Sequence, residues 1–302
     1  MLKFSLKLFV WVFGSIIGLL GALYLVLWGV NFHDQPPSVL VQEFESNYKN
    51  RIAIPDDINA FVYVMGFAVA KGEDPMQWGA KRLQLINRVT NGHKGDLEND
   101  PLMKDVDSKP ARDKVIKTLA DKCSHIVDEA CLNMLEQGDE AIGLWFKTEP
   151  ELYQRYSALL GFTRYQENAL NDVSMPLPNF AAVLDGQKLF LARAFQLASQ
   201  GSDLEVLGML ERDAVYWRTV FASSDILISK MIALAALRRH FGMGNLILRK
   251  LAKTTKTYQV PESWQKSFTK NELSMQSCFR GEWFWFDKTV KNLKQGITYS
   301  PS

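Results

Sequence analysis

The hydrophobic pattern of the chain changes abruptly near residue 32. Leu8 to Phe32 consists almost entirely of Leu, Val, Ile, Phe, Trp, Gly and Ala, and no charged side chain lies between Lys7 and Asp34. As a helix rising 1.5 Å per residue this stretch would be ~37 Å long, enough to cross a hydrocarbon core of ~30 Å. A helix also satisfies all of its backbone hydrogen bonds within one segment. The pattern predicts a short tip at 1–7 and a transmembrane signal anchor at 8–32.

Small residues recur every four positions inside this apolar stretch. Gly14, Gly18 and Ala22 would therefore share one helix face, where two helix backbones can approach closely. The alternative is chance, because Gly is common in membrane helices. We treat the three residues as a candidate transmembrane packing face, for a second copy of the chain or for another protein.

The charges on either side of the apolar stretch predict its orientation. Lys3, Lys7 and the amino terminus precede it, whereas acidic residues follow it and the next lysine is Lys49. The positive-inside rule then places the N-terminus in the cytoplasm and the remainder outside, which in a bacterium is the periplasm. A cleaved signal peptide is the competing reading. It is disfavoured because the stretch exceeds the usual 7–15 residues and no A-x-A-like site follows it.

The remaining residues show helical rather than strand periodicity. We expect an exit linker and first helix at 33–53, then a helical domain at 54–302 with a possible division near 166–180. The predicted fold is all-α, built of antiparallel helical hairpins. The expected helices, with a long polar loop at 91–113, are 58–70, 76–89, 114–122, 126–137, 152–160, 182–199, 203–217, 226–240, 245–253, 262–278 and 283–293.

Several residues mark expected helix starts and turns. Asp74 followed by Pro75 has the pattern of an N-cap with proline at the first helical position. Capping boxes are expected where Thr148 precedes Glu151 and where Ser202 precedes Glu205. Gly201 is expected to turn the chain, and Ser223-Ser224-Asp225 to open the helix that follows.

Charge and composition restrict the class of partner. From residue 33 onward, removing Lys3 and Lys7 from the 35 basic residues leaves 33, which equals the 33 acidic ones. A neutral domain has no electrostatic reason to bind nucleic acid or to lie against anionic lipid. The chain also contains 8 Trp and 18 Phe, some of which are expected on a partner surface.

Two of the three cysteines are candidates for a disulfide. On one unbroken helix, Cys123 and Cys131 would be ~12 Å apart, too far for Cα atoms that must lie within about 7 Å. Their pairing therefore requires a break in the chain, which we expect near 121–124. Free thiols are the main alternative. A metal site with His125 is disfavoured, because no second ligand pair is present.

The sequence contains no recognisable catalytic motif. The four histidines form no paired spacing, and there is no nucleophile elbow, phosphate loop or dinucleotide fingerprint. Lys230 shares an apolar stripe, so it is expected to be buried, either with a depressed pKa for function or in an ion pair with Asp213 or Glu282. We favour the ion pair. Glu282 is read as a capping or pairing residue rather than a catalytic one.

Several short stretches carry a resemblance to a group of proteobacterial proteins of no established function. They are Asn59-Ala60 with Gly66 and Asp74-Pro75, Cys123 with Cys131-Leu132, Arg155-Tyr156, Trp217-Arg218 with Lys230-Met231-Ile232-Ala233, and Arg280-Gly281-Glu282. The resemblance implies one N-terminal membrane helix, a helical outer domain, a bacterial source and the two-cysteine feature. It implies no activity, substrate or catalytic residue.

These observations favour a non-catalytic function. We expect a periplasmic interaction or assembly factor of an envelope complex, with another membrane or periplasmic protein, or a second copy, as its partner. No cofactor, metal or nucleic acid is expected. The alternatives are an immunity protein against a periplasmic toxin, an envelope enzyme such as a peptidoglycan hydrolase or lyase, and a binder of small ligands or lipids.

Overall fold

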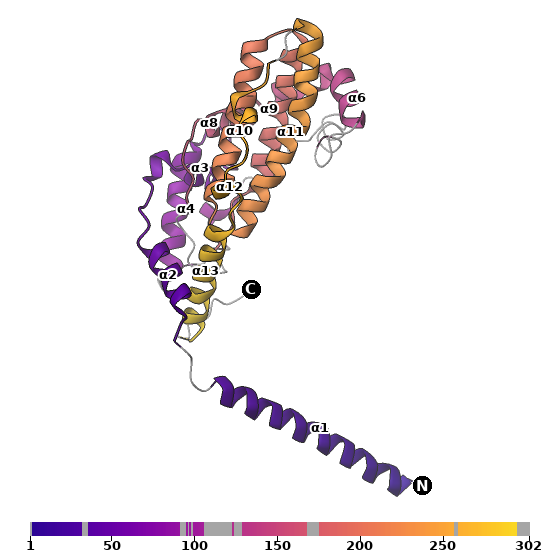
Figure 1. Cartoon of the computed structure of the whole chain (residues 1–302), viewed down its shortest axis with the longest axis vertical. Coiled ribbons are helices and arrows are strands. Elements are labelled where there is room, and N and C mark those ends of the chain that lie inside the picture. The colour runs from indigo at the N-terminus through magenta and orange to yellow at the C-terminus, as the bar shows by residue number, and fades with distance from the viewer. Residues whose placement is uncertain are drawn as a thin grey trace. The chain divides into compact units, whose positions relative to one another are not determined.

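The computed structural model describes residues 2–31, 36–90, 95, 97, 99–105, 123, 129–167, 175–256 and 259–294. The chain divides into two compact units, Met1–Lys49 and Asn50–Ser302. The possible division near 166–180 falls inside the second unit. Every named secondary-structure element among the described residues is a helix, so the all-α prediction is confirmed (Figure 1).

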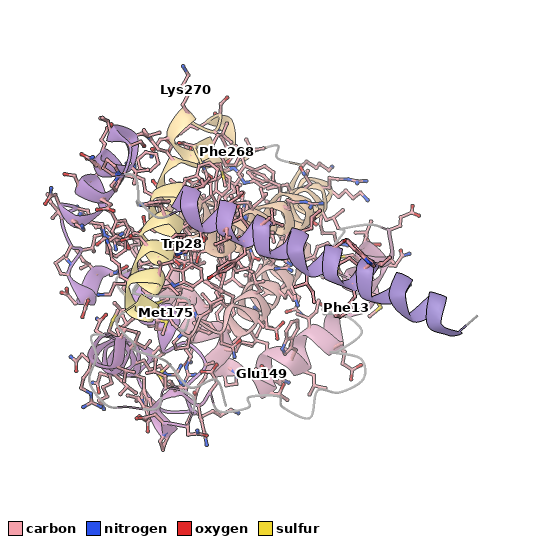
Figure 2. The ribbon with its side chains drawn as sticks, turned by 90° about the horizontal axis from the view of Figure 1, so that it is seen from below. Phe13, Trp28, Glu149, Met175, Phe268 and Lys270 are labelled. Atoms are coloured by element: carbon pink, nitrogen blue, oxygen red, sulfur yellow. A yellow bond between two sulfur atoms is a disulfide. The ribbon has the colours of Figure 1, made fainter. Side chains whose placement is uncertain are left out.

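The first unit consists of helices α1 (Leu2–Asn31) and α2 (Val39–Lys49). Within α1, Trp11–Val30 forms a 20-residue stretch with mean hydropathy 2.0, and none of it is buried against the protein. Its aromatic side chains include Phe13 and Trp28, which Figure 2 labels and which are both more than half exposed. The predicted anchor is therefore present as a helix long and apolar enough to cross a membrane.

The described part of the second unit consists of α-helices and three short 3-10 helices. Their order is η1 (Asp56–Ile58), α3 (Ala60–Met65), α4 (Pro75–Thr90), η2 (Pro101–Met103), α6 (Glu129–Gln137), α7 (Asp139–Thr148), α8 (Pro150–Leu159), α9 (Phe180–Ser199), α10 (Asp203–Ser223), α11 (Leu227–Thr255), η3 (Glu262–Gln265), α12 (Lys270–Leu273) and α13 (Gln276–Lys294). The expected helix at 114–122, most of the expected loop at 91–113 and the start of the helix at 126–137 lie outside the described residues.

Helix α9 is the centre of the core. It contacts α7, α8, α10 and α11, and Leu189, Phe190 and Leu191 in its middle are fully buried. Ala192 and Ala194 are buried on the same helix, because small side chains let its neighbours approach closely. Helices α9, α10 and α11 also contact one another pairwise and lie side by side in Figure 1. Their arrangement as antiparallel hairpins stays a prediction.

The helix starts were predicted better than the hydrogen bonds that cap them. Asp74 does cap α4, since its Oδ1 accepts the Met76 N–H at 2.9 Å. Ser202 is the N-cap residue of α10 but makes no capping hydrogen bond, so the box with Glu205 is wrong. The box at Thr148 is also wrong: Glu149 is the N-cap of α8, and the Thr148 hydroxyl donates back to the Trp145 carbonyl.

The second half of the domain differs most from expectation. Helix α11 continues for 29 residues, where two helices separated after His240 were expected. The expected helix at 262–278 is replaced by η3, α12 and the first residues of α13. The turn at Gly201 is confirmed, because this residue has a φ of +79°, which favours glycine.

Candidate functional site: buried polar contacts and an exposed apolar surface

A fully buried carboxylate, Asp213, lies at the centre of the helical core. Its Oδ2 accepts from Gln187 Nε2 at 3.2 Å and lies 2.7 Å from His240 Nδ1, and its Oδ1 accepts from the Tyr156 hydroxyl. These groups come from α8, α9, α10 and α11. Burial raises the pKa of Tyr156 well above its usual value, and the Asp213 charge adds to this, so the tyrosine remains a donor. We call Asp213, Tyr156, Gln187 and His240, together with Trp264, which bonds His240, the polar network.

The orientation of His240 decides what the polar network can do. The Trp264 indole N–H donates to His240 Nε2 at 2.7 Å. Because Trp has only a donor at this atom, Nε2 must be the acceptor and the ring proton lies on Nδ1, facing Asp213. In a catalytic Asp–His pair the far nitrogen faces a nucleophile. Here Trp264 occupies it, so the pair joins helices and is closed to a substrate.

Two further side chains complete the contacts around Asp213. The Trp217 indole N–H donates to the Tyr156 oxygen at 2.8 Å, and Gln187 Nε2 also donates to the Ala236 carbonyl at 3.0 Å. Arg239 Nη1 donates to Gln187 Oε1 at 3.0 Å, which connects a cation to the Asp213 charge through one amide. A buried charge with several donors is far less costly than an unpaired one.

Lys230 is buried as expected, but the predicted ion pair is wrong. Its Nζ donates to the carbonyls of Phe221 at 2.6 Å and Glu272 at 3.0 Å, and lies 4.3 Å from the centroid of the Phe221 ring. Burial lowers the pKa of Lys230, while the nearby Cys278 thiol acts in the opposite direction. Because the ammonium is directed at backbone oxygens and a ring face, it connects α10, α11 and α12 without needing a carboxylate.

The two proposed carboxylate partners of Lys230 lie elsewhere. Asp213 belongs to the polar network, and Glu282 Oε1 accepts the backbone N–H of Leu227 at 2.8 Å. Glu282 therefore caps the start of α11, which confirms a capping role for it. The structure does not bring Lys230, Asp213 and Glu282 together into one site.

The start of α11 holds a second carboxylate that the sequence did not single out. Glu167 is fully buried, and its Oε2 accepts from the backbone N–H groups of Asp225 and of Ile226, the latter at 3.1 Å. Burial raises the pKa of Glu167 to about 7, and the Asp225 charge adds to this. The Asp225 side chain pairs with Arg51, whose Nη2 also donates to the Glu167 carbonyl at 2.6 Å.

The expected opening of α11 by its own Ser223-Ser224-Asp225 is therefore corrected. The N-cap position is Ile226, which has no side-chain cap, and the free N–H groups bind Glu167 and Glu282 instead. Residues 58 and 55 positions away supply what a local serine usually supplies. No local sequence signal could have identified Glu167.

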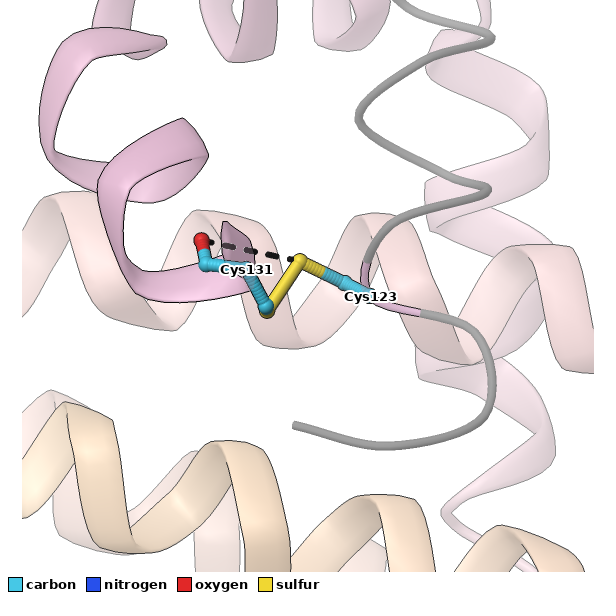
Figure 3. Close-up of a disulfide and its surroundings, with 2 residues drawn as sticks. All are labelled: Cys123 and Cys131. Atoms are coloured by element: carbon cyan, nitrogen blue, oxygen red, sulfur yellow. Dashed lines mark hydrogen bonds between the residues drawn. A yellow bond between two sulfur atoms is a disulfide. The ribbon is translucent and has the colours of Figure 1, made fainter. Parts of the chain in front are cut away.

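Cys123 and Cys131 are joined by a disulfide with Cα atoms 5.0 Å apart (Figure 3). Cys131 lies in the first turn of α6, whereas Cys123 precedes that helix, so one unbroken helix does not carry both. Apart from Cys123, the expected break at 121–124 lies outside the described residues. Cys278 is a free, buried thiol.

The candidate packing face of α1 is unoccupied within the chain. A Cβ atom added at Gly14 or Gly18 would meet no atom within 4 Å, and Ala22 is exposed on the same face. The face can therefore accept a second helix backbone.

The helical unit also exposes a set of large apolar side chains near the start of α11 and along α13. They are Leu227, Ile228, Met231, Leu234, Phe279, Trp283 and Phe286. We call them the apolar surface. Trp283 and Phe286 belong to a run of four aromatic residues at 283–286.

The described residues contain no group of three or more His, Cys, Asp or Glu side chains placed to hold a metal ion. No family model, curated protein or solved structure matches the chain.

Proposed function

We propose that this protein is a single-pass membrane protein that binds a partner protein as a non-catalytic interaction or assembly factor of the bacterial envelope. In this proposal its N-terminus is cytoplasmic and its helical unit lies in the periplasm. The partner is another membrane or periplasmic protein, or a second copy bound through α1.

The observation that carries the proposal is the uncovered state of α1. A stretch of 20 apolar residues with none of its surface buried requires lipid or another apolar helix around it. The open face at Gly14 and Gly18 suits a helix better than lipid, because close approach of two backbones needs small residues on one side.

The polar network supports a non-catalytic role. The Asp213–His240 pair has the composition of a catalytic pair, yet both ring nitrogens of His240 are already bonded. Lys230 is likewise directed at two carbonyls. These groups stabilise contacts between helices, which a rigid binding domain requires.

The test of partner binding is crosslinking in living cells, with captured proteins identified by mass spectrometry. We expect a defined partner, or a second copy, whose capture falls at least severalfold when Gly14, Gly18 and Ala22 are replaced by Leu. The matched control replaces Ile16, Leu20 and Leu23, on the opposite face of α1, by Val, and should leave capture unchanged. Equal capture by both variants would reduce α1 to a simple anchor.

A further inference from the structure

Helix α13 directs part of its apolar side chains away from the domain. It packs on the domain through Cys278 and Gly281, and a Cβ atom at Gly281 would lie only 1.9 Å from the Asp225 carbonyl oxygen; the indole nitrogen of Trp285 is also buried. Phe279, Trp283 and Phe286 follow one another at spacings of four and three residues, so they share the face on the other side. Phe279 and Phe286 are 61% and 60% exposed.

The exposed face of α13 continues onto α11. Glu282, next to Trp283, binds the backbone N–H of Leu227, which brings the two helices together at this point. Leu227, Met231 and Leu234 repeat at spacings of four and three residues and are also exposed. The two stripes together form the apolar surface, whose members are grouped rather than scattered singly.

The C-terminal segment that carries α13 has a small excess of basic residues, although the helical unit as a whole is neutral. Residues 262–302 contain four acidic and six basic residues: Glu262, Glu272, Glu282, Asp287, Lys266, Lys270, Arg280, Lys288, Lys291 and Lys294. The four acidic side chains are engaged within the protein, with Lys266, Arg218, the Leu227 N–H and Lys291 respectively. Lys270 is exposed and projects away from the ribbon in Figure 2.

The chain enters the helical unit at this same end. Arg51, near the start of the unit, pairs with Asp225, and the Asp225 carbonyl contacts Gly281. Residues 32–50 join it to α1. Helix α2 contributes ~16 Å and the other residues at most ~28 Å, so Arg51 stays within ~45 Å of the end of α1. Because the tether is this short, the end of the helical unit that carries Arg51 stays close to the membrane, and its effective concentration there is high.

We propose that the apolar surface rests on the anionic lipid bilayer in which the protein is anchored, with Phe279, Trp283 and Phe286 inserted among the headgroups. Exposed Trp and Phe on one helix face with Lys and Arg nearby are the features of helices that lie in a membrane interface. This second membrane contact goes beyond partner binding by α1 and does not depend on it. It would hold the helical unit in a fixed orientation on the bilayer.

The test places a nitroxide at Phe286→Cys in the full chain, reconstituted into vesicles of equal parts phosphatidylglycerol and phosphatidylcholine. Cys278 is buried, so the unsubstituted chain serves as the blank. The control site is Leu204→Cys, 82% exposed near Gly201, which lies beside Thr255 at the other end of α11, ~40 Å from Leu227. Accessibility to oxygen and to a water-soluble nickel chelate is measured by power saturation.

We expect the ratio of oxygen to nickel accessibility at position 286 to exceed that at position 204 at least severalfold, and Phe279→Cys to behave like Phe286→Cys. Equal ratios at 286 and 204 would overturn the proposal. Protection of position 286 from both reagents, lost in nanodiscs that hold a single copy, would assign the surface to a second copy and would also overturn it. Because all three sites are exposed, loss of folding is not expected, and circular dichroism verifies this.

Discussion

At the residue scale, the chain concentrates its buried charges at helix junctions. Asp213 receives donors from Tyr156, Gln187 and His240, and Glu167 receives two backbone N–H groups at the start of α11. Each carboxylate therefore substitutes for water where several helices meet. Removing one partner leaves the others buried without it, which is costlier than the value of any single hydrogen bond.

Asp213→Asn should lower the free energy of unfolding by about 3–4 kcal/mol, because the amide N–H group would face donors that now bind a carboxylate. The measurement is urea unfolding of the full chain in detergent, followed by circular dichroism. Asp57→Asn, at an exposed position in η1, is the control and should change stability by less than about 0.5 kcal/mol. A tolerated Asp213→Asn would contradict the importance given to the polar network.

Glu167 predicts a specific pH dependence. Its pKa is about 7 in the folded protein against 4.5 when unperturbed, so the folded state binds more protons between these values. Stability must then fall as pH rises from 4.5 to 7, by up to about 3 kcal/mol from this group. Burial also raises the pKa of Asp225, which has the same sign. Below pH 4.5 the contribution of Glu167 is constant.

The Glu167→Gln variant keeps an acceptor for the two N–H groups but cannot ionise. Its free energy of unfolding, measured across pH 4.5–8, should fall less steeply with pH than that of the unsubstituted chain. Glu140→Gln, on the exposed side of α7, should leave the slope unchanged. Parallel curves for Glu167→Gln and the unsubstituted chain would show that Glu167 is already ionised.

At the element scale, local periodicity predicts that a helix is present. It does not predict where the helix ends when a side chain distant in the sequence decides this. The sequence predicted that helix α11 would end near His240 and that a second one would begin at residue 245. In the structure a Cβ atom at Gly244 would lie 2.6 Å from Cζ2 of Trp264. The glycine thus makes room for the ring that bonds His240, and the helix runs on past it.

Capping shows the same limit of local reasoning. The structure contains a capping box at Thr269 and Glu272, a pair that was not singled out, in a helix of only four residues. Glu272 also pairs with Arg218 of α10 at 2.6 Å. The Thr148 and Ser202 patterns have the same spacing but do not form boxes, because spacing permits the bond without requiring it. The anchor and the disulfide pair could be predicted because each depends on a local rule of length or distance.

The disulfide predicts a stability difference of moderate size. Cys123 and Cys131 are 8 residues apart, and closing so short a loop contributes about 2–3 kcal/mol in the chain-entropy model. Replacing both cysteines with Ser should lower the free energy of unfolding by about that amount. Reducing the unsubstituted chain should give the same result, whereas Cys278 is not disulfide-bonded and reduction leaves it unchanged. An unchanged midpoint in both experiments would show that the disulfide adds no stability.

At the scale of the whole molecule, the state of the disulfide depends on the orientation of the anchor, and that orientation depends on the charges beside it. An apolar helix fixes the protein in a membrane, but the basic residues flanking it decide which side the helical unit occupies. Cytosolic thiols are kept reduced, whereas an exported domain meets an oxidising compartment. The proposed orientation is therefore reported by the state of two cysteines far along the chain from Lys3 and Lys7.

Replacing Lys3 and Lys7 with Glu should reverse the orientation in a large fraction of molecules, because Lys49 and Arg51 would then be the nearest basic residues to the span. The reversed molecules would retain Cys123 and Cys131 as thiols.

The measurement is alkylation of whole cells with a polyethylene-glycol maleimide after denaturation. It would add three adducts to the reversed molecules, against one on the exported chain, whose single thiol is Cys278. Lys71→Glu with Lys147→Glu, two exposed positions in the helical unit, makes the same charge change without altering the flanks and should keep one adduct. Three adducts on the unsubstituted chain would place the helical unit in the cytoplasm and remove the basis for a periplasmic partner, while leaving the helical packing and the lipid contact to be tested separately.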